Sequence, residues 1–351
     1  MIKFRHILPL VLAALIAAIS SSCVHRELVD SSNMHYIRVY LDEQIKNVTY
    51  GFYNETYEAP TYTRPINMRA VLASPKTGEV VSETVLRHHD SDSRGHYIDG
   101  YIGGYGGEYN LYVYHLGSPV TNIRNADNCY DIQAFTDKLS ERFLNYIPSL
   151  KDSLDADSIL EEPEHFLALS YKGVKVPLST SLDTLTTSSG DYFTAQSIVK
   201  SYYLQLYIQG EQWVRAAGAV ISGVSGSFSI GDTYSVVESD SAHVFFTMNY
   251  DNKIKRTGED VYSAVIYSTF QTFGRLSEAN CKNYLNLEFF KIDGTTQVET
   301  IDITHVFNTP IAIENQWILL ENEIIITRPE GAEEMGPGVD GWDDIEADIP
   351  M

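Results

Sequence analysis

The first 23 residues are the feature that most constrains this chain. Lys3 and Arg5 form a short basic lead, and an almost unbroken apolar run follows from residue 7 to residue 19. Three serines and then Cys23 come directly after this run. The order is typical of a secretory leader that ends in small residues at its cleavage site. The apolar run is too short to cross a bilayer, which takes about 20 helical residues.

Cys23 stands where a bacterial lipoprotein carries its lipid-modified first residue. Ser20, three residues before it, departs from the commonest signal, which has leucine there, and matches the relaxed form found in Bacteroidetes lipoproteins. We therefore expect residues 1–22 to be a signal peptide and Cys23 to be lipidated, with palmitate among its acyl chains. Residues 23–33 would then tether a folded body to the outer membrane, on either its periplasmic or its outer face. The alternative is an ordinary signal peptide with a cysteine nearby by chance.

The charge of the chain limits its partners. It has 25 basic and 47 acidic residues, a formal net charge of −22 at pH 7. Lys3 and Arg5 lie in the leader, so the remainder is more acidic still. Nucleic acids and anionic membrane surfaces attract basic proteins, so no nucleic-acid partner is expected. The lipid on Cys23, not charge, would hold the protein to a membrane.

Alternation of apolar and polar residues predicts a mainly β protein of the sandwich type. The chain contains 24 tyrosines, many β-branched residues, and Gly and Pro between its short alternating runs. In one clear run, Ile37, Val39 and Leu41 point to one side, as in a half-buried strand. The expected strands cover residues 35–42, 66–73, 79–87, 97–102, 108–115, 165–171, 174–178, 203–209, 213–222, 227–230, 243–250, 260–273, 284–292, 297–307 and 316–327.

These strands favour two domains, at residues 34–195 and 196–329, the second with enough strands for a Greek-key sandwich. One helix is expected between residues 131 and 147, where it would cover one side or end of the first domain. Its apolar residues recur at steps of three and four. They are Ile132, Phe135, Leu139, Phe143 and Ile147.

Residues 330–351 form an acidic tail without basic residues. Val339, Trp342 and Ile345 are spaced through it. A disordered acidic tail seldom contains tryptophan, because such segments have few aromatic residues. We expect part of the tail to dock on the folded body or on another subunit.

Cys129 and Cys281 are the only cysteines besides Cys23. They lie in different predicted domains. Two unpaired thiols are expected, with an interdomain disulfide as the alternative in an oxidising compartment.

Motifs for chemistry are mostly absent. Histidines and aspartates gather between residues 88 and 96, and a calcium-type loop starts there, but Arg94 and Tyr101 replace oxygen ligands at its fifth and twelfth positions. A solvated loop between strands is expected instead. The glycines at 103–107 lack the lysine and helix of a phosphate-binding loop, and a bend between strands is expected there. With no G-x-S-x-G or HExxH motif either, we expect no enzyme, cofactor or metal.

Six short segments spread along the chain form a distinctive set. They are Tyr-Ile-Arg-Val-Tyr-Leu-Asp-Glu at 36–43, Asn-Val-Thr at 47–49, Gly-Phe-Tyr-Asn at 51–54, Pro-x-Thr-Gly-Glu-Val at 75–80, Gly-Val-Asp-Gly-Trp-Asp at 338–343, and Asp-Ile-Pro at 348–350. Together with the leader, the set resembles the Bacteroidetes fimbrillin-like lipoproteins, including a branch related to fimbrial anchor and minor subunits.

The resemblance implies two transthyretin-like β-sandwich domains and no catalysis. It also implies assembly with other fimbrillin-like subunits by strand addition, in which a strand of one subunit fills a groove in the next. The strand containing Ile37, Val39 and Leu41 would cover such a groove. The tail segment with Val339, Trp342 and Ile345 would be the donor or a docked appendage.

A role in adhesion, with a host or microbial surface ligand, is compatible with the resemblance. The alternative function is that of a surface glycan-binding lipoprotein, in which tyrosines stack on sugars. The candidate residues are Tyr53, Tyr57, Tyr62 and Tyr105. Ordinary packing in strands and loops is the better account of most of them.

Overall fold

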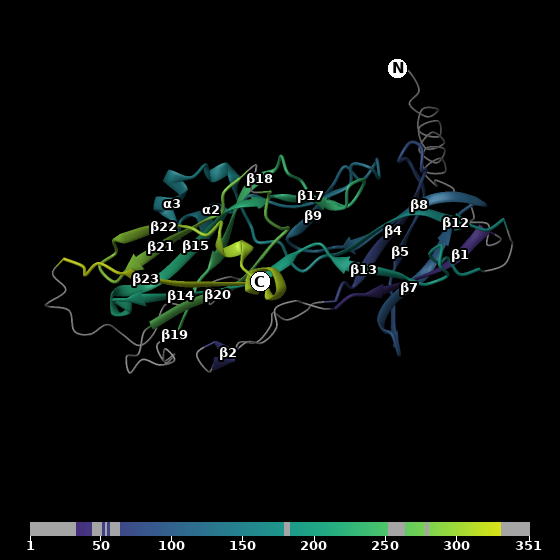
Figure 1. The fold of residues 1–351 in the computed structure, drawn as a ribbon. Coiled ribbons are helices and arrows are strands. Elements are labelled where there is room, and N and C mark those ends of the chain that lie inside the picture. Colours follow the sequence, from purple (N-terminus) through teal and green to yellow (C-terminus); the bar gives the residue numbers. More distant parts are fainter. Residues whose placement is uncertain are drawn as a thin grey trace, which may run out of the picture.

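The structure is a computed structural model that describes residues 33–43, 51–52, 55–56, 64–178, 183–251, 264–277 and 281–330. This part of the chain is mainly β, as the sequence predicts. Most strands up to residue 197 gather at one end of the molecule, and most strands from residue 200 onward gather at the other (Figure 1). No helix in these residues is long and apolar enough to cross a membrane.

An eight-stranded sheet forms the first end. Its order is β5 (Val80–Leu86), β4 (Asn67–Ala73), β8 (Gly107–Leu116), β12 (Leu167–Val176), β13 (Phe193–Ser197), β1 (Met34–Leu41), β7 (Gly95–Gly103) and β6 (His88–Asp92). One hydrophobic cluster joins inward residues of β1 and β7 to those of β4, β8 and β12. The two halves of the sheet therefore face each other across a common core, as in a sandwich.

Two sheets form the second end. One contains β11 (Ile159–Leu160), β18 (Ser241–Thr247), β15 (Val214–Ser225), β21 (Tyr284–Lys291) and β22 (Thr296–Asp302). The other contains β19 (Asn249–Asp251), β20 (Ala264–Thr272), β14 (Lys200–Gln209) and β23 (Trp317–Ile325). Their inner faces share one core, in which Phe246 and Phe270 stack with ring centroids 4.2 Å apart.

Smaller elements complete the described residues. A four-stranded sheet contains β17 (Ser235–Val236), β16 (Ser227–Ser229), β10 (Gln133–Thr136) and β9 (Thr121–Arg124), and β2 (Gly51–Phe52) pairs with β3 (Glu55–Thr56). The short helices are α2 (Glu141–Leu144), α3 (Pro148–Ser153), η3 (Ala156–Ser158), η4 (Glu211–Trp213), η5 (Val306–Asn308) and α4 (Pro310–Asn315).

Asp293–Gly294 forms a hairpin turn, as an Asp-Gly pair between two alternating runs predicts. β21 and β22 pair antiparallel on either side of it, and Lys291 N–H donates to the Thr295 carbonyl at 2.8 Å. Gly294 has φ +83°, a left-handed conformation that glycine adopts without steric cost. The local sequence therefore sets this turn.

The predicted helix over residues 131–147 is wrong. Gln133–Thr136 is strand β10, which pairs with β9 and β16, and only Glu141–Leu144 is helical before Pro148 opens α3. Ile132 and Ala134 are both fully buried, so an alternating pattern lay within the helical one. Pairing partners far away in sequence decided between the two periods.

The helical segment also packs in a different place from the one predicted. Leu144, Ile147 and Leu150 form a cluster with Val220 and Phe245, which lie on strands of the second end. A Cβ at Gly218 of β15 would come 2.7 Å from an Ile147 methyl, so glycine admits this close approach. The segment thus covers β15 and β18, not the first sandwich. The predicted division of the chain near residue 195 stays a prediction.

Two smaller expectations need correction. The strands predicted at 165–171 and 174–178 are one strand, β12, interrupted by a β-bulge between Tyr171 and Val174. Gly173 in the bulge has φ +79°. The loop predicted at 88–96 contains strand β6, whose residues are all exposed as expected but pair with β7.

Both cysteines among the described residues, Cys129 and Cys281, are free, as the sequence analysis favoured. Cys129 is fully buried, and burial raises the pKa of its thiol to about 11.

The α3 helix is fastened to the second end by one buried carboxylate. Glu288 of β21 has no exposed surface and accepts hydrogen bonds from the backbone N–H groups of Ser149 and Leu150, at 3.0 and 2.9 Å. These groups lie in the first turn of α3, where N–H groups have no partner within the helix. Glu288 therefore satisfies them.

We expect Glu288→Ala to lower the free energy of unfolding by about 1–3 kcal/mol, because it leaves two N–H groups without an acceptor. Denaturant unfolding followed by circular dichroism measures the loss. Glu314→Ala, at an exposed position of α4, is the control and should change it by less than about 0.5 kcal/mol. Equal effects of the two substitutions would contradict this role of Glu288.

Candidate functional site

β1 occupies a slot between two strands of the first sheet. It pairs antiparallel with β7 from Met34 to Tyr40 and parallel with β13, where Val39 lies opposite Phe193. Asp42 N–H extends the second ladder by donating to the Ala195 carbonyl at 3.0 Å. β1 therefore forms backbone hydrogen bonds along both of its edges and is an inner strand of the sheet.

The inward face of β1 fills the core of the sandwich. Ile37 and Val39 have no exposed surface, and Leu41 is 6% exposed. All three belong to the cluster that includes Leu72 and Leu111 of the opposite strands. The structure therefore brings these three sequence-predicted residues together, on one face of one strand. Their role in strand complementation stays a prediction.

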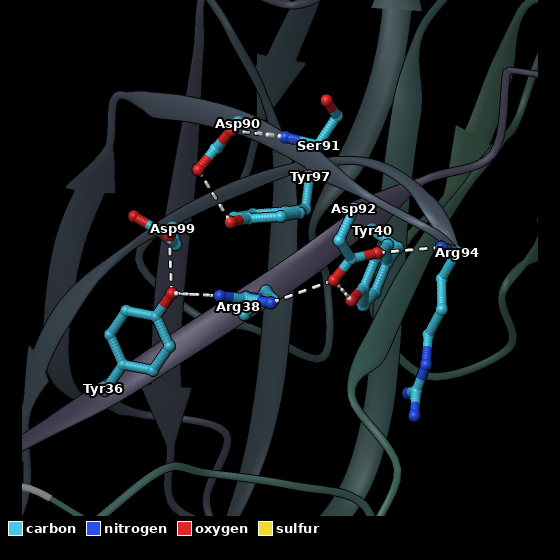
Figure 2. A network of polar contacts seen from close by, with 9 residues as sticks. All are labelled: Tyr36, Arg38, Tyr40, Asp90, Ser91, Asp92, Arg94, Tyr97 and Asp99. Carbon is cyan, nitrogen blue, oxygen red and sulfur yellow. Dashed lines mark hydrogen bonds and ion pairs between the residues drawn. The ribbon is translucent and has the colours of Figure 1, made fainter.

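The outward face of β1 carries a polar network (Figure 2). Arg38 donates from Nε to the Tyr36 hydroxyl at 3.2 Å, and that hydroxyl donates to Asp99 of β7 at 2.5 Å. Arg38 also pairs with Asp92 of β6 at 3.2 Å. The network therefore links three adjacent strands, β1, β7 and β6. Arg38 lies directly opposite Asp99 in the ladder between β1 and β7.

A second group of contacts reinforces the link to β6. The Tyr40 hydroxyl donates to Asp92 at 2.6 Å, and the Tyr97 hydroxyl donates to Asp90 at 3.1 Å. The Arg38 guanidinium lies 3.8 Å from the centroid of the Tyr97 ring, within the range of a cation–π contact. Figure 2 shows the guanidinium enclosed by these aromatic and acidic side chains, while the Arg94 side chain points away.

The electrostatics of the network follow from these bonds. Burial and the hydrogen bond to Asp99 raise the pKa of Tyr36 to about 12, so its hydroxyl stays a donor. The Tyr40 hydroxyl and the Arg94 backbone N–H lower the pKa of Asp92 below its usual value of 3.8. Asp92 is therefore ionised at neutral pH and pairs with Arg38 as a carboxylate.

The histidines and aspartates of β6 hold no metal-binding arrangement. In the described part of the chain, no group of three or more His, Cys, Asp or Glu side chains is placed to bind a metal ion. The exposed His88 instead lies with Nδ1 2.9 Å from Asp99 Oδ1. Asp90 and Asp92 likewise contact residues of the neighbouring strands.

A cleft opens beside the C-terminal end of β1. It has a volume of about 450 Å³ and is lined by Tyr40, Arg94, His96, Asp191 and Tyr192, among others. The Arg94 guanidinium lies 5.7 Å from the centroid of the Tyr192 ring. The cleft therefore combines aromatic surface with hydrogen-bonding groups.

Known proteins share this chain's length and fold. A Bacteroides ovatus protein named "Putative fimbrium anchoring subunit Fim4B" is 23% identical over 287 residues, which cover 73% of this chain and 81% of that protein. The fold matches the crystal structure of a Bacteroides ovatus protein described as a "putative adhesin", with a TM-score of 0.58, 18% identity and coverage of 88% of this chain and 98% of that one. The chain resembles fimbrial anchor and adhesin proteins of Bacteroidetes.

The resemblance expected from the sequence is thus confirmed. The fimbrial anchor protein Mfa2 from Porphyromonas gingivalis is a more distant structural neighbour, with a TM-score of 0.45, 10% identity and coverage of 83% of this chain and 90% of that one. No family model matches the chain.

Sequence reasoning missed the polar network on the outer face of β1. The alternation at 35–42 placed Tyr36, Arg38 and Tyr40 on the outer face of a strand, but it named no partners for them. The partners come from β7 and from β6, and the second of these was predicted as a loop. A signal existed: Asp90 and Asp92 alternate with serine, which places both carboxylates on one face of a strand.

Four other predicted site residues lie outside the described residues. They are Cys23, Val339, Trp342 and Ile345.

We expect Asp92→Ala to lower the melting temperature at pH 7, because it removes the acceptor for Arg38 and Tyr40. The pKa of Asp92 is lowered in the folded state, so its contribution is complete above pH 3.8 and is lost as the pH falls through the folded-state pKa. The difference between the two proteins should therefore shrink in acid. Thermal unfolding measured across this range tests the expectation.

Tyr40→Phe is the matched control, since it keeps the ring and removes only the donor to Asp92. Tyr40→Phe should lower the melting temperature at pH 7 by less than Asp92→Ala does, and this loss should also shrink in acid. A melting-temperature difference for Asp92→Ala that is constant from neutral pH to below pH 3.8 would show that the carboxylate charge has no role.

Proposed function

We propose that this protein is an outer-membrane lipoprotein of a fimbrium, an anchor or minor subunit with a structural, adhesive and non-catalytic role. Its two domains would be transthyretin-like sandwiches, and it would assemble with other fimbrillin-like subunits by β-strand complementation. The similarity to a protein named as a fimbrium anchoring subunit supports the fimbrial role. Lipidation of Cys23 would hold the subunit in the membrane, at its periplasmic or outer face.

The position of β1 is the observation that carries the assembly mechanism. β1 lies between β7 and β13 and presents Ile37, Val39 and Leu41 to the core. If β1 left this slot, both neighbours would expose unpaired backbone groups along an apolar groove. An incoming strand can satisfy such groups with main-chain hydrogen bonds and fill the groove with alternate side chains.

The end of the described chain supports a role for the tail. β23 is an edge strand, paired on one side with β14, and the acidic tail follows it after a few residues. The proposed donor or docking residues of the tail are Val339, Trp342 and Ile345. A tail that leaves from a sheet edge is free to reach a neighbouring subunit.

A second candidate function is glycan binding, and the cleft beside Tyr40 and Tyr192 favours it. Small-ligand sites combine apolar surface with a few polar groups, as this cleft does. A saccharide array probed with Tyr192→Ala and with Tyr105→Ala would separate the cleft from the exposed tyrosine named in the sequence analysis. Binding lost in the first variant alone would favour the cleft.

We expect removal of residues 330–351 to abolish assembly without unfolding the body. Native protein pulled down from outer membranes should give a ladder with other fimbrial subunits that disappears on boiling, because strand-complemented contacts dissociate slowly. The truncated protein should run as a monomer with the same melting temperature as the full chain. A monomer for the full chain in unboiled samples would exclude the assembly mechanism.

We expect Cys23→Ala to release the protein from the membrane fraction, because it removes the site of lipid attachment. Fractionation followed by mass spectrometry of the N-terminal peptide tests this, with Cys281→Ala as the control. A variant that stays in the membrane fraction without lipid would refute anchoring by Cys23.

A further inference from the structure

The turn between β7 and β8 forms an exposed tip of the first sandwich. It consists of the glycine-rich residues 103–107, and Tyr105 at its apex is 71% exposed. Leu178, just after β12, is 91% exposed and lies against Gly106, where an added Cβ would come 2.4 Å from Leu178 Cγ. Two large apolar side chains thus share this tip.

Exposure alone carries little meaning, because single apolar residues are common on protein surfaces. The position of Tyr105 and Leu178 relative to the N-terminal segment is the informative observation. Gly104 N–H donates to the Asn33 carbonyl at 2.9 Å, and Met34 lies opposite Gly103 in the ladder between β1 and β7. The chain from Cys23 therefore enters the sandwich at the same tip.

The length of this entering segment limits where the tip can be. Ten residues, 24–33, separate Cys23 from β1. A chain of ten residues spans at most about 35 Å. β8 runs away from the tip for ten residues, about 30 Å, so its far end at Leu116 lies at the opposite end of the sandwich from the point where this segment enters.

We propose that Tyr105 and Leu178 contact the lipid leaflet that holds Cys23, and so fix the orientation of the anchored body. The inference rests on the proposed lipidation of Cys23. Tyrosine suits the boundary between headgroups and acyl chains, because it has an apolar ring and a polar hydroxyl. Leucine adds apolar area that gains free energy when it leaves water.

The negative charge of the protein favours an apolar contact with the membrane over an electrostatic one. A chain with a net charge of −22 is repelled by anionic headgroups, so any membrane contact made in addition to the lipid on Cys23 has to come from apolar side chains. The charged residues nearest the tip on paired strands, Glu108 and Lys175, lie opposite each other and offset each other's charge. The tip is therefore locally neutral.

A spin-label depth measurement on the lipidated full chain tests the proposal. Nitroxide is attached to Leu178→Cys in a background with Cys129→Ala and Cys281→Ala, and the protein is placed in phosphatidylethanolamine–phosphatidylglycerol vesicles. We expect several-fold lower accessibility to a nickel chelate, and higher accessibility to oxygen, than for the same protein with Cys23→Ser in solution. Equal accessibility in the two states would overturn the proposal.

Ile66→Cys provides the matched control. Ile66 is 77% exposed and precedes Asn67, which lies opposite Leu116 at the far end of β8. Its label should stay accessible to nickel on vesicles. A label at 66 that is protected as strongly as one at 178 would mean that the body lies on its side, which also contradicts the proposed orientation.

Hydrogen exchange on the unsubstituted protein gives the same test without labels. Peptides covering residues 103–108 should exchange more slowly on vesicles than in the Cys23→Ser protein, and peptides covering 65–70 should not change. Mass spectrometry of the peptide that contains Cys23 separates the proposed lipidation from the proposed membrane contact of the tip. Lipid on Cys23 with an unprotected tip would refute only the membrane contact, whereas absence of lipid would refute both.

Discussion

Burial of the inward side chains of β1 is the contact on which the first sandwich depends. Ile37, Val39 and Leu41 are each worth roughly 1.5–3 kcal/mol when removed from water. Their sum is comparable to the total stability of a typical domain, about 5–15 kcal/mol. The slot of β1 must therefore be filled, by β1 or by a strand that takes its place. This requirement is the physical basis of the strand complementation that we propose.

The outer face of the same strand has a different role. Arg38, Tyr36 and Tyr40 contact Asp92 and Asp99 across two neighbouring strands, partly exposed to solvent. Ion pairs in such positions contribute little net free energy, because water competes for both partners. Their geometry nevertheless fixes which residues lie opposite one another. The core thus supplies the stability of β1, and the network supplies its register.

Residues 121–160 tie the two ends of the molecule together. β10 pairs with β16 and β11 pairs with β18, so strands from the first half of the chain complete sheets made from the second half. The buried Glu288 holds the first turn of α3 against the same region. The two ends of the molecule are therefore joined by more than one segment of chain.

The sequence by itself determined the mainly β class, most strand positions and the turn at Asp293–Gly294. Alternation and glycine conformation are local properties, so they can be read from neighbouring residues. It also placed Ile37, Val39 and Leu41 on one face. Only the tertiary structure decided that residues 133–136 form a strand, that β6 is paired, and that Arg38 meets Asp92. Strand β10 and the Arg38–Asp92 pair depend on partners distant in sequence, whose backbone groups and charges no local pattern contains. β6 pairs with the neighbouring strand β7, but its residues are all exposed and polar, so apolar alternation did not mark it as a strand.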